Sequence, residues 1–223
     1  MKSFLQLIKQ HLLFLVLLFL LFITGTVIQL TDTKINCFLK LNITHNHWLD
    51  NIFLVATCMG DGLFSIVLAL ILMLVWRLYR LGIQLLLGFF ISGIVVQILK
   101  TLFSAPRPMT IIPHSTYHFF LDGISHGGFS SFPSGHTTSI FTLITILIAR
   151  LQNSLACVLL FTLALVVGYS RIYLGQHFLE DVMAGSVLGV LTGLLIVLFT
   201  QNKQWDFKQV SFKRNVGKQS YSA

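Results

Sequence analysis

Long apolar stretches separated by short polar links dominate the chain. They cover approximately residues 11–30, 52–76, 82–99, 135–152, 154–170 and 182–200. A helix needs about 20 consecutive apolar residues to cross the hydrocarbon core of a bilayer, and each run comes close to that length. The pattern therefore predicts an all-α, polytopic membrane protein with six transmembrane helices in one bundle. The simplest division is one membrane domain over residues 1–200 and a basic tail over residues 201–223.

Two of the runs have unusual features. The second is interrupted by Gly60-Asp61-Gly62, so its lipid-embedded part is expected to begin near Leu63, with the preceding stretch at the interface. The first follows Lys2 and Lys9 and resembles a signal peptide, but it is long and has no clear small-x-small cleavage site. We interpret it as a retained first span.

Composition supports the membrane assignment. Hydrophobic residues make up 55% of the chain, charged residues only 10%, and the mean hydropathy is +0.84, whereas about a quarter of the residues in a soluble domain are charged. The sequence contains nothing that resembles a nucleic-acid-binding module. The three cysteines are scattered without CxxC spacing, so neither a disulfide framework nor a thiolate metal site is predicted.

The distribution of Lys and Arg between the links predicts the orientation. With the N-terminus in the cytoplasm, ten basic residues fall on the cytoplasmic side: Lys2, Lys9, Arg77, Arg80, Arg150, Lys203, Lys208, Lys213, Arg214 and Lys218. Five fall on the opposite side: Lys34, Lys40, Lys100, Arg107 and Arg171. Both termini are therefore expected on the cytoplasmic side of a plasma membrane, or of a bacterial inner membrane. The net charge of +8 then reflects topology and attraction of the tail to anionic headgroups.

Three polar clusters lie at the edges of these apolar runs, all on the predicted outer face. They are Lys100 with Arg107-Pro108, then Pro133-Ser134-Gly135-His136, then Ser170-Arg171 with His177 and Asp181. Ionisable groups near a bilayer are expensive to desolvate, so their repeated placement at such boundaries indicates function. Three permanent cations, two imidazoles and one carboxylate are suited to holding a phosphate and attacking it.

The second cluster opens a helix. Pro133 has the backbone φ of a helix start, and Ser134 is a candidate cap, so the free N–H groups of the first turn are available to an anion. Taken alone, the cluster is equally consistent with an ordinary helix start that carries a stray histidine.

The third cluster places His177 and Asp181 four residues apart, which is the spacing of side chains on one helical face. A carboxylate that binds one ring nitrogen fixes the tautomer and leaves the other nitrogen free to attack. A surface ion pair is the alternative. Lys100 also fits an ordinary cation at a helix end, whereas Arg107 lies between two prolines, a stiff mount that suits bidentate phosphate binding.

Together the clusters resemble the three-part signature of the type 2 phosphatidic acid phosphatase superfamily. The chain reads Lys100-x6-Arg107-Pro108, Pro133-Ser134-Gly135-His136 and Ser170-Arg171-x5-His177-x3-Asp181, which matches every signature position in the order of the family. The signature occupies residues 100–181, and the resemblance covers roughly residues 50–200.

The resemblance implies a metal-independent phosphatase or diphosphatase with a phosphohistidine intermediate and no cofactor. It implies that His177 is the nucleophile, that Asp181 orients it, and that His136 is the general acid. It also implies that the remaining signature residues hold the phosphate: Lys100, Arg107, Ser134, Gly135, Ser170 and Arg171. Independently, a site built from Arg and Lys can stabilise a phosphoryl group by electrostatics alone.

Several alternatives stay open. A lipid phosphotransferase would carry the same signature, and a transporter could use the basic site only to capture an anion, although binding alone needs no oriented nucleophile. His114, His118, His126 and His136 allow a zinc site. The expected substrate is a membrane lipid phosphate such as undecaprenyl diphosphate, phosphatidic acid, phosphatidylglycerol phosphate or a lipid A phosphate. The sequence does not choose among these lipids or predict the oligomeric state.

Overall fold

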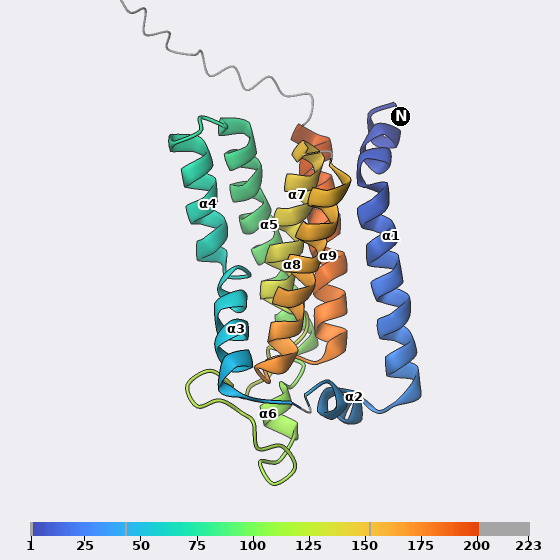
Figure 1. The fold of residues 1–223 in the computed structure, drawn as a ribbon, viewed down its shortest axis with the longest axis vertical. Coiled ribbons are helices and arrows are strands. Elements are labelled where there is room, and N and C mark those ends of the chain that lie inside the picture. The colour runs from blue at the N-terminus through green and yellow to red at the C-terminus, as the bar shows by residue number, and fades with distance from the viewer. Residues whose placement is uncertain (1, 43, 152, 201–223) are drawn as a thin grey trace, which may run out of the picture.

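The computed structural model describes residues 2–42, 44–151 and 153–200, and every regular element in these residues is a helix. The helices are α1 (Lys2–Thr31), α2 (Lys34–Leu41), α3 (His47–Cys58), α4 (Gly62–Leu74), α5 (Tyr79–Phe103), α6 (Pro108–Ile111), α7 (Gly135–Leu151), α8 (Ser154–Tyr173) and α9 (Leu179–Thr200). Figure 1 shows the long helices aligned in one bundle. The prediction of an all-helical chain is confirmed, and the predicted tail over residues 201–223 lies outside the described residues.

Four of these helices are long and apolar enough to cross a membrane, namely α1, α5, α8 and α9. The α3–α4 pair passes the same test as one broken span with a bend of 57°. Helix α7 is apolar but has only 17 residues. The described residues therefore contain four to five candidate spans, and the predicted six requires α7 as well.

The break between α3 and α4 has a local cause. Asp61 has an extended backbone conformation, and its side chain accepts a hydrogen bond from the Leu63 backbone N–H at 3.0 Å, so it caps the start of α4. A capped start ends the helical hydrogen-bond ladder from α3. Helix α3 packs against α8, so the residues before Gly60 belong to the bundle.

The closest packing in the bundle joins α7 to α9. Gly185, Gly189 and Gly193 form a stripe along α9, and a Cβ atom on Gly189 would lie 2.5 Å from the Thr138 carbonyl oxygen of α7. Small residues at this spacing allow two helix backbones to approach closely in a membrane. Helices α8 and α9, which we expected to be neighbours because their link is short, do touch. The main partner of α9 is nevertheless α7.

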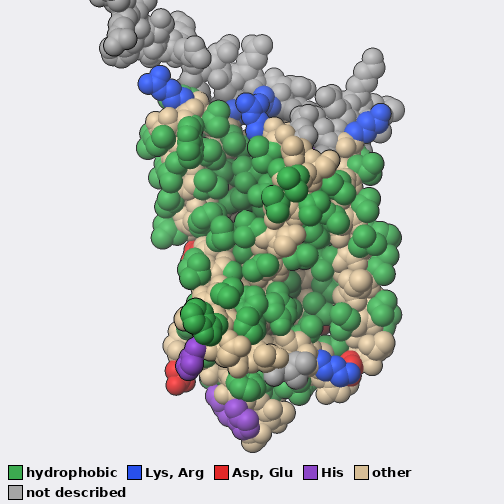
Figure 2. Space-filling view, in the orientation of Figure 1, with side chains coloured by type: hydrophobic (Ala, Val, Ile, Leu, Met, Phe, Trp, Pro, Cys, Tyr) green, Lys and Arg blue, Asp and Glu red, His purple; other side chains and the backbone are tan. Residues whose placement is uncertain are grey.

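The surface matches a membrane protein. Figure 2 shows hydrophobic side chains over the middle of the molecule, with Lys and Arg side chains mainly at one end and His side chains at the other, where a further basic side chain lies beside an acidic one. Large apolar side chains on the outer helices are exposed, such as Phe19 (63%), Leu63 (66%) and Ile94 (61%). Helices α2 and α6 and the loop before α7 cover the histidine-bearing end (Figure 1).

Candidate active site

All three polar clusters lie at the end of the bundle that α2 and α6 cover. Lys100 is in the last turn of α5, Gly135 begins α7, Arg171 is in the last turn of α8, and Asp181 is in the first turn of α9. The alternating direction of these helices brings the four ends together, away from the end where α1 begins and α9 terminates (Figure 1). The expectation that the clusters share one end of the bundle is confirmed.

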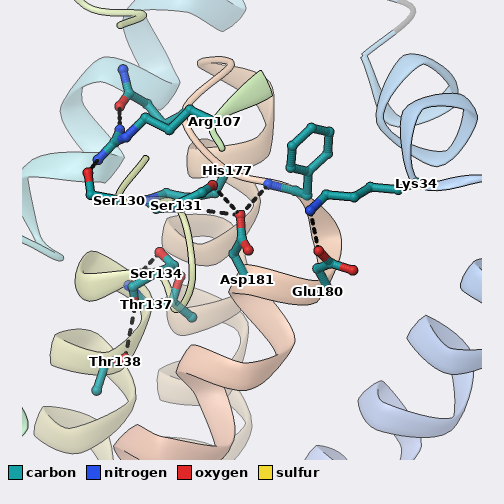
Figure 3. Close-up of polar contacts among 12 residues, drawn as sticks. Lys34, Arg107, Ser130, Ser131, Ser134, Thr137, Thr138, His177, Glu180 and Asp181 are labelled. Atoms are coloured by element: carbon teal, nitrogen blue, oxygen red, sulfur yellow. Dashed lines mark hydrogen bonds and ion pairs between the residues drawn. The ribbon is translucent and has the colours of Figure 1, made fainter. Parts of the chain in front are cut away.

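His177 and Asp181 form the centre of the site. The His177 Nδ1 atom lies 3.5 Å from Asp181 Oδ2, and both side chains are buried, with exposed fractions of 2% and 0%. At this distance the two atoms are in close polar contact, longer than a normal hydrogen bond, and the contact becomes an ion pair only when the imidazole is protonated. Asp181 Oδ2 also accepts hydrogen bonds from the Ser131 hydroxyl at 2.6 Å and from the Phe178 backbone N–H at 2.8 Å (Figure 3). These donors hold the carboxylate in place beside the imidazole.

The surroundings of His177 keep its imidazole neutral. Burial lowers the pKa of His177 to about 4, although the Asp181 carboxylate opposes this shift. The Arg171 and Arg107 cations add to the lowering. A neutral imidazole has a free lone pair, which a nucleophile needs.

Ser134 joins the start of α7 to the start of α9. Its backbone N–H donates to the Asp181 carbonyl oxygen at 3.0 Å, and its hydroxyl oxygen accepts a hydrogen bond from the Thr137 hydroxyl at 2.9 Å (Figure 3). The Ser134 hydroxyl oxygen also accepts from the Thr137 backbone N–H at 3.4 Å, which supports its predicted role as a helix cap. The signature serine therefore lies directly against the signature aspartate.

Hydrogen bonds to neighbouring residues hold Arg107 in the same region. Its guanidinium is 7% exposed and donates to the Gln176 amide oxygen and to the Ser130 hydroxyl. Its backbone N–H donates to the Gly128 carbonyl oxygen at 2.9 Å. Because Gln176 immediately precedes His177, Arg107 is tied to the turn that carries the proposed nucleophile.

The two signature residues of α8 behave differently. Arg171 is 7% exposed, and its guanidinium donates to the Thr57 hydroxyl of α3. Its carbonyl oxygen accepts from the His177 backbone N–H at 3.1 Å. Ser170, by contrast, donates its hydroxyl proton to the Val167 carbonyl oxygen at 2.6 Å, inside its own helix. Ser170 thus contributes to the local helix geometry in this structure.

Several donors of the site lack a partner. The Nε atoms of Arg107 and Arg171 are buried without a hydrogen bond, and the salt bridges of the described residues do not include Lys100. Buried polar groups are ordinarily hydrogen-bonded. Unsatisfied guanidinium donors that lie close to a half-buried ammonium group are the arrangement that an anion such as phosphate would complete.

His136 lies beside a cavity of about 160 Å³. The cavity is lined by Gly60, Gly62, Ser92, Gly93, Val96, Gly135, His136 and Ser139. These residues come from the α3–α4 break, from α5 and from α7, so the cavity lies between these elements and includes the second signature cluster. Among the glycines that line it, Gly93 has open space around it, because an added Cβ would have no atom within 4 Å, whereas Gly60 and Gly62 are tightly packed.

The loop before α7 contributes no group of metal ligands. Within the described ranges, three or more His, Cys, Asp or Glu side chains do not converge on a common point. His114, His118 and His126 are exposed on the loop, and the His126 Nδ1 atom lies 3.2 Å from the Gln176 amide nitrogen. The donor set described here does not match the three or four ligands of a protein zinc site.

Sequence reasoning missed three residues that orient the site: Ser131 on Asp181, Gln176 on Arg107 and Thr57 on Arg171. Ser131 and Gln176 each lie within three residues of a signature position, and this proximity was a usable signal. Thr57 is distant in sequence, and only the packing of α3 against α8 places it. The glycine stripe on α9 was visible in the sequence and explains why α7 and α9 meet.

Comparison with known proteins agrees with this geometry. Undecaprenyl-diphosphatase BcrC of Bacillus subtilis is 31% identical over 111 residues, which cover 49% of this chain and 53% of that protein. The crystal structure of Aquifex aeolicus LpxE is 30% identical and superposes with a TM-score of 0.62 over 73% of this chain and 93% of that one. The transmembrane PAP2 type phosphatidylglycerolphosphate phosphatase of Bacillus subtilis has a TM-score of 0.63 at 23% identity, over 89% of this chain and 99% of that one, so it shares the fold.

The chain spans about half the length of curated relatives such as BcrC. The PAP2 superfamily profile matches residues 81–205, which is more than half of the chain and includes all three polar clusters. The chain therefore belongs to the PAP2 superfamily.

Proposed function

We propose that the protein is an integral membrane lipid phosphatase that hydrolyses a lipid phosphomonoester or an isoprenoid diphosphate. The observation that carries this proposal is the buried His177–Asp181 pair beside guanidinium groups with unsatisfied donors. An oriented nucleophile beside an anion site is needed for phosphoryl transfer, whereas capture of an anion requires only the cations. BcrC, a relative at 31% identity, is named for such a reaction.

The first chemical step follows from the orientation of His177. Its Nδ1 atom faces Asp181, so Nε2 is the nitrogen that attacks phosphorus. The new N–P bond forms as the bond from phosphorus to the leaving oxygen breaks, and His136 gives that oxygen its proton. Lys100, Arg107 and Arg171, with the Ser134 hydroxyl and the Gly135 backbone N–H at the start of α7, hold the phosphoryl oxygens while charge spreads over them.

The second step restores the enzyme. His136, now neutral, accepts a proton from water, and the oxygen of that water attacks the phosphohistidine. The N–P bond breaks, inorganic phosphate leaves, and Asp181 stabilises the positive charge that His177 carries in the intermediate. Because one histidine must begin neutral and the other protonated, the rate should depend on pH as a bell-shaped curve.

The lipid nature of the substrate is supported by the position of the site. The cavity beside His136 is lined by residues of the α3–α4 break, α5 and α7. A lipid whose tail stays in the bilayer could place its phosphate on the cations and its leaving oxygen near His136. Undecaprenyl diphosphate, phosphatidylglycerol phosphate, phosphatidic acid and lipid A phosphates all have this form.

We further propose six transmembrane spans, with the α3–α4 pair and α7 included, in a domain over residues 1–200. The termini would face the cytoplasm and the site the periplasm or cell exterior. The basic side chains at the end opposite the site support this orientation (Figure 2). Reporter fusions after Leu81 and after Leu121 should report cytoplasmic and external locations respectively, and the reverse result would invert the site.

The experiment that tests the function is phosphate release by the purified protein from a panel of lipid monophosphates and diphosphates. His177→Ala is the control and should abolish release. A transporter would release no phosphate from any lipid. A phosphotransferase would instead yield a phosphorylated acceptor whose amount depends on the acceptor concentration.

A further inference from the structure

Helix α2 covers the active-site end of the bundle but lies outside residues 81–205, which match the PAP2 profile. It begins at a cap in which the Thr33 side chain accepts a hydrogen bond from the Asn36 backbone N–H. It lies across the end of the bundle rather than along it (Figure 1). Its contacts are directed at the segment that carries Arg171, His177 and Asp181.

The most deeply buried apolar side chain of α2 is Phe38, which is fully buried. Its ring meets the Phe178 ring at a centroid distance of 5.6 Å in an edge-to-face arrangement. Phe178 follows His177, and its backbone N–H donates to Asp181. Phe38 therefore packs on the residue that links the proposed nucleophile to the carboxylate that orients it.

The polar contacts of α2 reach the neighbours of two further signature residues. Lys34 forms an ion pair with Glu180, the residue before Asp181, and its ammonium nitrogen lies 4.2 Å from the centre of the Phe178 ring (Figure 3). Just after α2, the Asn42 side-chain amide donates to the carbonyl oxygen of Ile172 at 3.2 Å. Ile172 follows Arg171.

The Lys34–Glu180 pair has an electrostatic consequence. Glu180 is a carboxylate in the first turn of α9, and it immediately precedes Asp181. Without a cation next to it, this carboxylate would repel a phosphate substrate. The side chain of Glu180 points toward Lys34 in Figure 3, and the Lys34 ammonium compensates its charge.

We propose that α2 is a positioning element of the active site and that Lys34 is its positioning residue, anchoring Glu180 and Phe178 and neutralising the Glu180 charge beside the phosphate. This proposal rests on the proposed phosphatase function. Lys34 acts through the residues next to His177 and Asp181 and does not touch the substrate.

The chain offers a matched control on the same helix. Lys40 also forms an ion pair, with Asp32, but it is 70% exposed, and neither residue adjoins a signature position. Lys34→Met should lower kcat/KM for a lipid phosphate about three- to tenfold, the scale of one ion pair and one cation–π contact. Lys40→Met should stay within about twofold of the unsubstituted protein.

Two rescue variants separate positioning from a general structural role. Lys34→Arg should retain activity, because it keeps the charge on Glu180. The double variant Lys34→Met/Glu180→Gln should recover most of the loss through a lower KM, because the unpaired carboxylate is gone. Equal activities of Lys34→Met and Lys40→Met would overturn the proposal, and so would a double variant that stays as low as Lys34→Met.

His177→Ala in the same assay separates failure of this inference from failure of the proposed function. If His177→Ala retains turnover, the phosphatase mechanism is wrong. If His177→Ala is inactive while Lys34→Met behaves like Lys40→Met, the mechanism stands and only the role of α2 is wrong.

Discussion

The two sides of the phosphate site are built differently. On the α7–α9 side, Ser134, His177 and Asp181 are 0–2% exposed. Ser134 donates its backbone N–H to Asp181, and Asp181 contacts the His177 imidazole, beneath helices that approach closely along the α9 glycine stripe. On the α5 side, Lys100 is only half-buried, and the cavity beside His136 passes Gly93, where an added Cβ would have no atom within 4 Å.

This difference indicates that the two sides of the site have different roles. The reacting side must hold its groups in a fixed geometry, because displacement of a catalytic group by about 1 Å can cost a hundredfold in rate. Under the proposed function, the open side admits and releases a lipid. Rigid packing and open space therefore occur on opposite sides of one site, and substitutions on the two sides should affect kcat and KM differently.

Asp181→Asn should have the largest effect on the closed side. The substitution removes the charge that orients and stabilises the His177 imidazole, and kcat should fall by about a hundredfold to ten-thousandfold with little change in KM. Phosphate release from a lipid substrate measures this, with Asp32→Asn, whose carboxylate pairs with the exposed Lys40, as the control. A loss smaller than about threefold would mean that Asp181 does not orient the nucleophile.

Ser131→Ala should have a smaller effect on the same side. It removes the 2.6 Å hydrogen bond to Asp181 Oδ2, a bond to a charged group, and kcat should fall by about tenfold. Ser130→Ala, which removes only a long contact at 3.4 Å to Arg107, is the control. Equal rates for the two variants would argue against a role for Ser131 in holding the carboxylate.

Gly93→Phe tests the open side. The ring would enter the cavity beside His136 and compete with the lipid chain, so KM for a long-chain lipid phosphate should rise about fivefold. Hydrolysis of a small water-soluble phosphate ester should be unchanged. Ile94→Phe, at an exposed position that does not line the cavity, is the matched control. Loss of activity toward both substrates would show that the cavity is not a lipid path.

The effect of pH on the stability of the folded protein should be the smallest of the predicted effects. Burial lowers the pKa of His177 to about 4 in the folded protein, against about 6.5 in the unfolded chain. Between these values the unfolded state binds more protons, so stability is full above pH 6.5 and is lost as the pH falls toward 4. Lowering the pH from 7.5 to 5.5 should cost about 1 kcal/mol.

Thermal unfolding in detergent micelles measures this loss. The melting temperature of the unsubstituted protein should fall over that interval, and it should fall less in His177→Gln, which cannot titrate there. Identical pH dependence of the two proteins would place His177 in a solvated environment.

Much of the fold could be predicted from hydrophobicity, because long apolar runs determine helices in a bilayer irrespective of their partners. The run expected over residues 154–170 became α8 (Ser154–Tyr173), and that over 182–200 became α9 (Leu179–Thr200). Helix α2 has only eight residues and forms because Phe38 is buried by distant residues. A pattern along the sequence does not contain such contacts.

The same distinction applies to the site. The signature residues are readable because they match the family signature at every position and because their types suit phosphate binding. The residues that hold the signature side chains in place cannot be read from the sequence in this way. Thr57, for example, reaches Arg171 only through the packing of α3 on α8. Ser170 is the opposite case: it is readable as a signature residue, but its hydroxyl donates a hydrogen bond within its own helix.

The most direct test of the account is to trap the covalent intermediate. Purified protein is mixed with lipid substrate that carries a labelled terminal phosphate and is quenched in denaturant within the first turnover. We expect label on the protein that is acid-labile and base-stable, maps to the peptide containing His177, and is lost in His177→Ala while Lys40→Met retains it. Hydrolysis without protein-bound label, or label that persists in His177→Ala, would contradict the assignment of His177 as the nucleophile.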